Sequence, residues 1–441
     1  MATKEKINIP SDIRNSTIIL VVAYVLNFVG FTFLISTMSL TGKALLTGAG
    51  AAGVPLSLLS GVALFSALPF GSMADKLGRK IAIIIMIITY ALGDLIGAFA
   101  INAQNGTLYL VAMAMLGVGV GAMALFATAV TDLYPAKYKG RASGFAQLGV
   151  MAANTLGYLI AAPIITAYGT TSIYYVALCC QVAAIILILA LKKDPRDMGR
   201  SLQEYWPKEA FNEVELNPSL TKAENVPPEH NRSSLKLAFM WPILLAVILR
   251  VWIHLGANFI NVALPVAFDA MGYSLTAIST FLVARALASF VFASPCGQMI
   301  DKYGRKFGFI TAPAVTIIGI LTIAFIQNSV CIYIGCALIG IGNAIANVVP
   351  GAVCNDVTYL SERSRAVAIF GISTNIGGFI FPVPMAMILT NYGLSGLAVA
   401  CGAFLLIPIL LAVFTLHETS VGHFKGYELD AAPASAAETA A

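Results

Sequence analysis

Charged residues are scarce in this chain of 441 residues: Asp, Glu, Lys and Arg make up only 11% of it, whereas hydrophobic residues make up 59%. A soluble globular protein carries about 25% charged residues, so the composition excludes an ordinary series of soluble domains and points to a membrane. The net charge of +5 at pH 7 is not interpreted as nucleic-acid binding, because the positions of the positive charges matter more than their sum.

The sequence also lacks the motifs of common catalytic chemistry. It has no HExxH, GxSxG or P-loop pattern, and its seven cysteines form no CxxC pair and have no histidine at metal-ligand spacing. We therefore expect no enzyme, no bound metal or cofactor, and no direct use of ATP. The stretch GVGVGA at 117–122 fits a loose dinucleotide fingerprint, but it lies inside an apolar run, so we interpret it as close helix packing.

What the chain has instead is a series of long apolar runs. A helix needs about 20 apolar residues to cross the hydrocarbon core, and hydrocarbon offers no partner to a bare N–H or C=O, which leaves an open chain no alternative to helix. Twelve runs have this length, at 16–39, 54–73, 81–101, 107–131, 142–166, 171–191, 238–266, 275–297, 307–326, 330–354, 366–390 and 393–416. The sequence therefore predicts an all-α membrane protein with twelve transmembrane helices.

Lysine and arginine predict the orientation of these helices. They gather in alternate loops on one side of the membrane, whereas the loops of the other side carry only Lys43. By the positive-inside rule both termini are cytoplasmic, in a multi-pass protein of the plasma membrane. The predicted order is a cytoplasmic N-terminus (1–15), a six-helix bundle (16–191), a polar cytoplasmic linker (192–237), a second six-helix bundle (238–416) and a cytoplasmic, low-complexity tail that we expect to be disordered (417–441).

Two charged segments occur twice in the chain. GSMADKLGRK (71–80) and GQMIDKYGRK (297–306) each follow the second helix of a bundle. A second pair of segments begins at Asp132 and at Asp356, and each contains an Arg-Ala pair at the same spacing from the Asp. Two related halves in the same orientation are a transporter architecture.

The repeated decapeptides resemble a signature of the major facilitator superfamily, G-x-x-x-D-(K/R)-x-G-(R/K)-(R/K), and the stretch 132–141 is similar to the sugar-porter and organic-acid:proton symporter branches of that family. The resemblance implies two pseudo-symmetric six-helix bundles around a central cavity. It also implies a cytoplasmic gate, whose residues are Gly71, Asp75, Gly78, Arg79, Asp132 and Arg141 in the first half and Gly297, Asp301, Gly304, Arg305, Asp356 and Arg365 in the second.

The resemblance implies specific contacts within this gate. They are Arg79 with Asp132, Arg305 with Asp356, Asp75 with the start of the eleventh helix and Asp301 with the start of the fifth. Arginine can bind a carboxylate through two hydrogen bonds, and Gly78 and Gly304 permit a tight turn between helices. The alternative is that these charges only determine the topology.

A few polar residues lie within the apolar runs. Charged groups at mid-membrane cost about 2.5–3.5 kcal/mol each on insertion scales, and they usually mark a functional pathway. The predicted substrate-binding residues are Arg285 in the eighth helix, Arg250, His254, Asn258 and Asn261 on one face of the seventh, and Tyr24, Asn27, Asn154, Asn343, Asn347 and Asn375 on other helices. Two arginines with almost no acid beside them predict an anionic substrate, most simply a carboxylate.

Other roles for these groups stay open. Either arginine could form a structural tie to Asp94, Asp269 or backbone carbonyls. Asp94 and His254 are the candidates for carrying a coupled proton, with a structural carboxyl group and a neutral, hydrogen-bonded histidine as the respective alternatives.

The function predicted from these features is secondary active transport of a small organic anion by alternating access, coupled to the proton gradient. The expected partners are this substrate, protons and the lipid bilayer, with no nucleic acid, and the expected state is a monomer. The alternatives are a drug/proton antiporter that exports its substrate, a transporter of sugars or other neutral metabolites, and, from another class, a receptor or sensor with the same fold.

Overall fold

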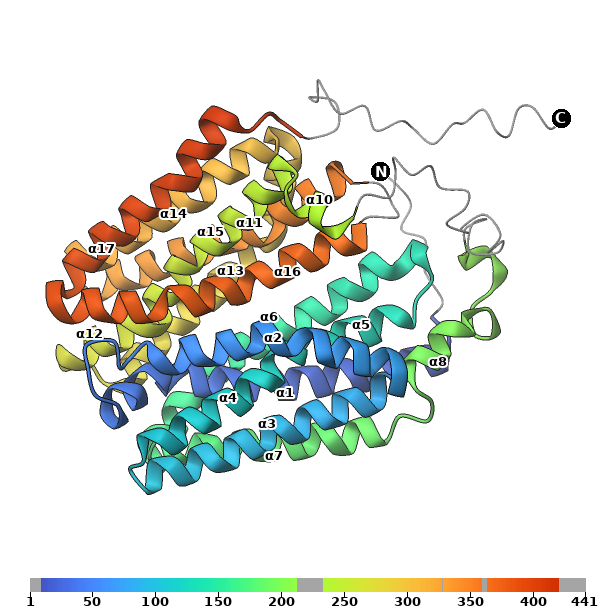
Figure 1. Ribbon diagram of the computed structural model, residues 1–441, viewed down its shortest axis with the longest axis horizontal. Coiled ribbons are helices and arrows are strands. Elements are labelled where there is room, and N and C mark those ends of the chain that lie inside the picture. Colours follow the sequence, from blue (N-terminus) through green and yellow to red (C-terminus); the bar gives the residue numbers. More distant parts are fainter. Residues whose placement is uncertain (1–8, 212–232, 327, 359–362, 420–441) are drawn as a thin grey trace. The chain divides into compact units, whose positions relative to one another are not determined.

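The computed structural model describes residues 9–211, 233–326, 328–358 and 363–419, and this part of the chain is helical, without strands (Figure 1). The first half contains α1 (Ser11–Leu45), α2 (Val54–Leu77), α3 (Arg79–Asn102), α4 (Gly106–Ala122), α5 (Ala124–Asp132), α6 (Ala136–Tyr168), α7 (Thr171–Leu189), α8 (Pro195–Arg200), η1 (Leu202–Glu204) and η2 (Lys208–Ala210). The second half contains α10 (Ser234–Ala238), α11 (Trp241–Asn258), η6 (Phe259–Ala263), α12 (Leu264–Ala270), α13 (Leu275–Tyr303), α14 (Arg305–Phe325), α15 (Ser329–Asp356), α16 (Arg363–Ile380) and α17 (Pro382–Thr415).

The number of membrane crossings depends on one break near the end of the chain. Within the described residues, 11 helical segments are long and apolar enough to cross a membrane, and the last of them, Ile372–Thr415, has 44 residues. A straight helix of that length would measure about 66 Å, twice the thickness of a hydrocarbon core. The backbone leaves the helical conformation at Gly393, with φ 69° and ψ −174°, so this segment supplies the two predicted crossings 366–390 and 393–416.

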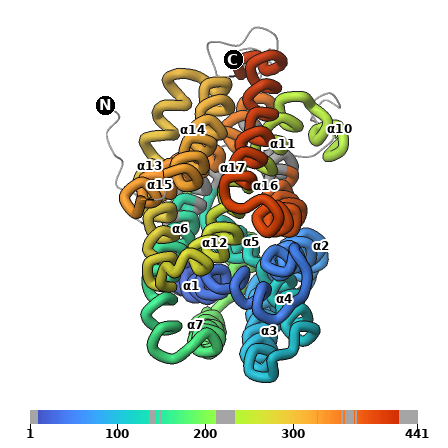
Figure 2. The backbone as a smooth tube through the Cα atoms, turned by 90° about the vertical axis from the view of Figure 1, so that its left-hand side faces the viewer, coloured from blue at the N-terminus to red at the C-terminus, as the bar shows by residue number. Residues whose placement is uncertain are grey.

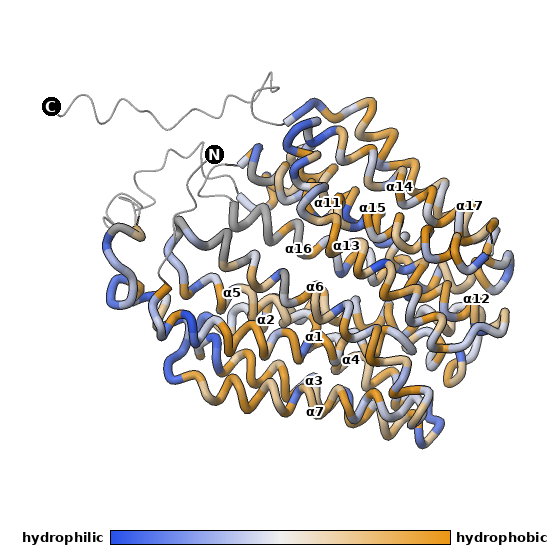
Figure 3. The backbone as a smooth tube through the Cα atoms, turned by 180° about the vertical axis from the view of Figure 1, so that it is seen from behind, coloured by the Kyte–Doolittle hydropathy of each residue, from blue (hydrophilic) through white to orange (hydrophobic). Residues whose placement is uncertain are grey.

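Hydrophobic residues predominate along these helices, as the hydropathy colouring of α3 and α7 shows (Figure 3). On α3 the exposed large apolar residues recur every three or four positions: Ile81, Ile85, Ile88, Leu92, Leu95 and Phe99. A soluble helix would carry polar residues on that face. The exposed apolar stripe is the face that lipid would cover, while the opposite face of α3 holds the fully buried Tyr90 and Asp94.

The helices pack into two compact units. Unit 1 comprises the described residues of Met1–Lys222, Asn258–Ala286 and Gly378–Leu394, and unit 2 comprises those of Ala223–Ala257, Leu287–Gly377 and Ser395–Ala441. The division into two six-helix bundles joined by a linker at 192–237 stays a prediction.

Glycines allow the helices of each unit to approach closely. In unit 1, α4 packs against both α2 and α3, and α7 packs against α1 and α3 (Figure 2). A side chain at Gly117 would overlap the Leu59 carbonyl of α2, and one at Gly119 would overlap the Tyr90 ring of α3. In unit 2, Gly342 of α15 meets a threonine of α14 in the same way. These contacts confirm that GVGVGA is a helix-packing segment.

This packing generates a stability prediction. Gly119→Ala should lower the free energy of unfolding by about 1–3 kcal/mol, because the new methyl group enters space that the Tyr90 ring fills. Gly144→Ala on α6 is the matched control: no atom lies within 4 Å of the new methyl group, and alanine favours helix by up to about 1 kcal/mol. Thermal unfolding of the purified protein in detergent measures both, and equal melting temperatures would contradict the packing role.

Candidate functional site

The first charged decapeptide forms a compact ionic cluster at the junction of α2 and α3. Arg79, the first residue of α3, donates from Nε to Asp132 Oδ2 at 3.0 Å and from NH1 to Asp75 Oδ1 at 2.9 Å. Asp132 ends α5 and Asp75 lies in the last turn of α2. One guanidinium therefore links three helices of unit 1.

The second decapeptide repeats this geometry in unit 2. Arg305, the first residue of α14, donates from Nε to Asp356 Oδ2 at 2.8 Å and from NH1 to Asp301. Both implied arginine–aspartate pairs are thus present, one in each unit. The implied contacts of Asp75 with the eleventh helix and of Asp301 with the fifth stay predictions. The side chains of Arg141 and Arg365 lie outside the described part of the chain.

A further carboxylate completes each cluster, and neither of these two acids was among the predicted gate residues. Asp194, just after α7, accepts the backbone N–H groups of Arg79 at 3.1 Å and Lys80 at 2.8 Å. Glu418, just after α17, accepts those of Arg305 at 2.7 Å and Lys306 at 3.1 Å. Each acid occupies the N-terminus of a helix, where unpaired N–H groups and the positive end of the helix dipole stabilise negative charge.

These acids explain the second glycine of each decapeptide, Gly78 or Gly304. Gly78 has φ 103° and Gly304 has φ 94°, a left-handed conformation that other residues rarely adopt. A Cβ atom at Gly78 would also meet the Asp194 carboxylate, and one at Gly304 would meet Glu418. The expected tight turn is confirmed, and it leaves the helix N-terminus open to the acid. Gly71 has no heavy atom near a would-be Cβ, so the described contacts do not require a glycine there.

Lysine and arginine side chains of the two clusters donate hydrogen bonds to carbonyl groups at the C-terminal ends of helices. Lys80 Nζ donates to the carbonyls of Leu189 at 3.1 Å and Leu191 at 2.7 Å, at the C-terminus of α7. Lys306 Nζ donates to the Val413 carbonyl of α17 at 2.9 Å. Arg196 holds the other side of the first cluster by donating to the carbonyls of Asp75 and Lys76.

Arg285, within the membrane-spanning part of unit 1, is only 9% exposed. It lies on α13, donates from NH2 to the Tyr158 hydroxyl of α6 at 3.3 Å, and places its guanidinium carbon 5.9 Å from the centre of that ring. Its Nε is buried without an acceptor, and none of the ion pairs of the described residues involves Arg285. The structural tie to Asp94 or Asp269 considered from the sequence is therefore not formed among these residues.

Arg250, in unit 2, is the centre of a polar cluster from three helices. Its Nε donates to Thr374 Oγ1 of α16 at 3.2 Å, and its NH1 donates to Asn347 Oδ1 of α15. One turn later, His254 Nδ1 lies 2.8 Å from the Arg250 carbonyl. A carbonyl only accepts, so Nδ1 carries the proton in this contact. The structure thus brings together three polar positions that are far apart in the sequence.

The seventh membrane segment departs from a regular helix. The α-helix α11 ends at Asn258 and continues as the π-helical segment η6 before α12 begins at Leu264. The wider π turn changes the angular position of every later residue, so Asn261 does not continue the regular spacing that linked it to Arg250 and His254. Single π turns frequently occur at functional sites, and Asn261 Oδ1 is buried with no hydrogen-bond partner in the described part of the chain.

The other predicted binding residues make interhelical contacts or lie half-buried. Asn27 is fully buried and donates to Gln181 Oε1 of α7, and Tyr24 stacks on the ring of Phe126 at 5.0 Å. Asn154 accepts from Thr32 at 3.3 Å. Asn343 and Asn375 are half-buried, and Asn258 is buried. Tyr24 and Asn27 thus contact neighbouring helices, and Asn27 Oδ1 is buried without a hydrogen-bond partner among the described residues.

Comparison with known proteins places this architecture. The model of the Major Facilitator Superfamily matches residues 20–256 and 246–439. The chain is 26% identical over 359 residues to the sialic acid transporter NanX of Escherichia coli (strain K12), covering 79% of this chain and 80% of that protein. It is 20% identical over 395 residues to the MFS-type transporter YddS of Bacillus subtilis (strain 168), covering 86% of each.

Solved structures show the same fold. A partially occluded, inward-open structure of the xylose transporter XylE from E. coli superimposes with a TM-score of 0.72 at 14% identity, covering 95% of this chain and 100% of that one. The human organic anion transporter MFSD10 superimposes with a TM-score of 0.63 at 15% identity, covering 91% and 100%.

The apolar helices and the duplicated charged clusters define a multi-pass membrane transporter. The chain belongs to the Major Facilitator Superfamily.

The acids at the helix N-termini generate the second prediction. Asp194→Asn and Glu418→Gln should each lower the free energy of unfolding by about 1–2 kcal/mol, because the amide offers one uncharged acceptor oxygen where the carboxylate offers two charged ones to the backbone N–H groups. Asp197→Asn is the control, since this exposed carboxylate pairs only with its neighbour Arg196 among the described residues, and it should change the value by less than about 0.5 kcal/mol. Thermal unfolding in detergent that shows all three variants alike would exclude the capping role.

Proposed function

We propose that this protein moves a small organic anion bearing a carboxylate across the plasma membrane by alternating access, and that the proton gradient drives accumulation. The observation that carries the anion proposal is Arg285. A buried guanidinium is costly unless an anion or several acceptors compensate it. Tyr158 offers one neutral hydroxyl and the face of its ring, and the Nε donor is left without an acceptor.

A substrate carboxylate would supply an acceptor for the Nε–H group of Arg285. Carboxylate oxygens accept two parallel hydrogen bonds from a guanidinium, and the combined contact adds geometric selectivity to charge attraction. Arg250 provides a second cationic centre in unit 2, where Thr374 and Asn347 orient its guanidinium. Hydroxyl and amide side chains are among the groups that orient these two guanidinium groups.

The relatives support an acid with hydroxyl groups more than a hydrophobic drug. NanX transports sialic acid by its name, and sialic acids are sugars that carry a carboxylate. A neutral sugar is the second candidate, and the observation that favours it is the set of amide side chains in the membrane segments, including Asn343 and Asn375. A neutral sugar, however, gives no reason for the uncompensated charge of Arg285.

Asp94 is the group that best fits a coupled proton. It is fully buried on α3, and neither carboxyl oxygen has a hydrogen-bond partner among the described residues. Burial of an unpaired carboxylate costs far more than burial of the neutral acid, so this environment favours the protonated form. The Tyr90 hydroxyl, one turn earlier, is also buried and has no hydrogen-bond partner within the described ranges. His254 fits less well, because its Nδ1 already carries a proton, and a second proton on Nε2 would add positive charge one turn from Arg250.

The ionic clusters at the helix junctions are proposed to act as the cytoplasmic latch of alternating access. Each combines an exposed aspartate, 71% exposed at Asp75 and 72% at Asp301, with an arginine that is held from the other side by a second aspartate. A partner from elsewhere in the molecule could therefore compete for these exposed carboxylates. Such competition shifts the populations of the two access states without dismantling either cluster.

The anion proposal predicts how substitutions of Arg285 act on binding. With a panel of carboxylates that includes N-acetylneuraminate, an acid that stabilises the wild type against heat should bind about tenfold more weakly to Arg285→Lys and at least about 100-fold more weakly to Arg285→Gln. Lysine keeps the charge but not the forked geometry. Ligand-induced thermal stabilisation measures the affinity apart from transport.

Two comparisons make this test selective. Arg14→Gln removes an exposed arginine near the start of α1 and should leave binding unchanged. Wild-type stabilisation of Arg285→Gln by the acid would assign Arg285 a structural role and remove the main support for an anionic substrate. Stabilisation of the wild type by neutral sugars alone would favour the second candidate.

The coupling proposal predicts a split between two transport modes. In proteoliposomes, Asp94→Asn should abolish accumulation driven by an inward proton gradient but retain exchange of labelled for unlabelled substrate, because exchange requires no net proton transfer. Asp269→Asn, at an exposed position near the end of α12, should retain both modes. Uphill accumulation by Asp94→Asn, or wild-type accumulation that follows sodium instead of protons, would contradict the proposal.

A further inference from the structure

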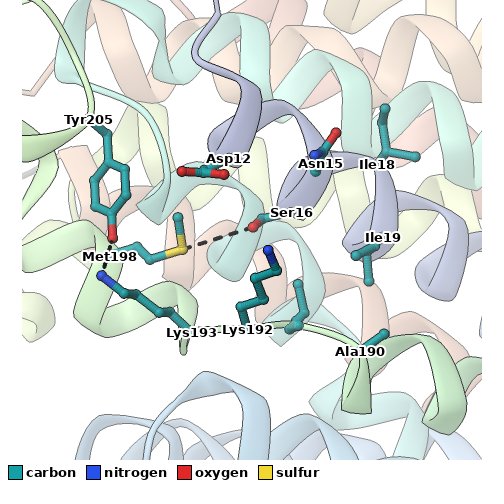
Figure 4. A pocket seen from close by; sticks show the side chains of 11 residues that line it. Asp12, Asn15, Ser16, Ile18, Ile19, Ala190, Lys192, Lys193, Met198 and Tyr205 are labelled. Atoms are coloured by element: carbon teal, nitrogen blue, oxygen red, sulfur yellow. Dashed lines mark hydrogen bonds between the residues drawn. The ribbon is translucent and has the colours of Figure 1, made fainter.

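A pocket lies at the end of the membrane-spanning part of unit 1, and Arg285 is not among the residues that line it. It has a volume of about 500 Å³ and lies between the first turns of α1, the end of α7 and the segment that leads into α8 and η1 (Figure 4). The distribution of lysine and arginine places this end of the helices at the cytoplasmic surface. The proposed transport function uses none of its lining residues.

The polar half of the pocket is basic. Lys192 and Lys193 extend into it, with Asn15, Ser16 and Tyr205 around them (Figure 4). Lys193 donates to the Tyr205 hydroxyl at 2.9 Å, and this hydrogen bond raises the pKa of the lysine. Lys192 has no hydrogen-bond or ion-pair partner among the described residues, and the only acid in the lining is Asp12.

The other half of the pocket continues into lipid-facing surface. Ile18 and Ile19 of α1 and Ala190 after α7 form its apolar wall. Ile18 is 53% exposed, and Val22 follows one turn further along α1. On α7, Ile186 and Leu189 are 62% and 58% exposed just before the two lysines. The pocket therefore opens where exposed apolar side chains give way to ammonium groups.

We infer that this pocket binds the headgroup of an anionic phospholipid of the inner leaflet. The phosphodiester would lie between Lys192 and Lys193, and the acyl chains would follow the exposed side chains of Ile18 and Val22 on α1 and of Ile186 and Leu189 on α7. A soluble anion would use the lysines but would leave this apolar surface uncovered. The adjoining apolar surface and basic pocket match the two parts of one lipid molecule, and lysines just beyond a membrane helix attract anionic lipid.

The same segment connects the pocket to the first ionic cluster. Asp194 and Arg196 lie within three residues after the two lysines. Asp194 contacts the N-terminus of α3, and Arg196 contacts the end of α2. A bound phospholipid would therefore hold the chain segment that carries these two side chains. Substrate binding by Arg285 is a separate property, and the lipid proposal does not depend on it.

Native mass spectrometry of the delipidated, full-length protein titrated with phosphatidylglycerol tests this inference. Each lysine near a membrane surface contributes about a fivefold change in anionic-lipid affinity, so Lys192→Gln/Lys193→Gln should bind the lipid about 30-fold more weakly than the wild type. Lys208→Gln/Lys236→Gln removes the same charge from two exposed lysines outside the pocket and should bind as the wild type does. Asp12→Asn removes the competing negative charge and should bind about fivefold more tightly.

A competition experiment distinguishes a phospholipid from a soluble phosphate-containing anion as the ligand of this pocket. Glycerophosphoglycerol, the headgroup without acyl chains, should not displace the lipid at equal concentration. Displacement by this headgroup would identify a soluble-anion site and overturn the lipid assignment. Equal lipid binding by the pocket variant and the control variant would overturn the site itself. The altered lysines are exposed, and the Asp12 variant, which should gain affinity, distinguishes a weakened site from a damaged protein.

Discussion

Hydrocarbon offers no hydrogen-bond partner to the peptide backbone, and the architecture of this transporter depends on that constraint. Because of this constraint every crossing is helical. The backbone groups that still need partners are those at the helix ends, where four N–H or four C=O groups have no partner within the helix. In this structure, side chains from other parts of the chain supply those partners. Asp194 and Glu418 satisfy N–H groups at the start of α3 and α14, while Lys80 and Lys306 satisfy carbonyls at the end of α7 and α17. Exposed ion pairs contribute little to the stability of a soluble protein. Here the residues of the ionic clusters also form hydrogen bonds to the unpaired backbone groups of helix ends.

The duplicated decapeptide therefore has two roles. It links neighbouring helices through its arginine, and it leaves one helix N-terminus open to a carboxylate. Its arginine connects to two aspartates, and its glycine leaves room for a third carboxylate at the helix N-terminus. Glycine is required at that position both for its left-handed backbone and for the absence of a side chain. The acids themselves lie outside the decapeptide, beyond the sixth and twelfth membrane segments, so each cluster joins the second, third, fourth and last helices of its half. That connectivity explains why the pattern recurs as a set in both halves.

Much of the fold could be predicted because its signals are local. Apolar length identified the crossings, and the resemblance of the repeated decapeptides to a family signature implied the pairs of Arg79 with Asp132 and Arg305 with Asp356. Asp194 and Glu418 were missed although a signal existed: each is an acid within a few residues of the end of an apolar run. Their partners are backbone groups more than a hundred residues away, and no residue pattern marks a bare N–H. The contact of Arg285 with Tyr158 and the π-helical segment η6 arise from packing between helices, which the periodicity of one helix does not contain.

The position of Glu418 has a practical consequence for how this chain can be shortened or fused. Helix α17 ends at Thr415, and a design based on helix boundaries would cut the chain there. Such a cut would remove the acceptor of two amide hydrogens that lie 113 and 112 residues earlier in the sequence, and α14 would begin with those groups unpaired near the membrane surface. The boundary of the folded second half therefore lies beyond its last helix. A reporter or affinity tag joined after Thr419 keeps this acid in place.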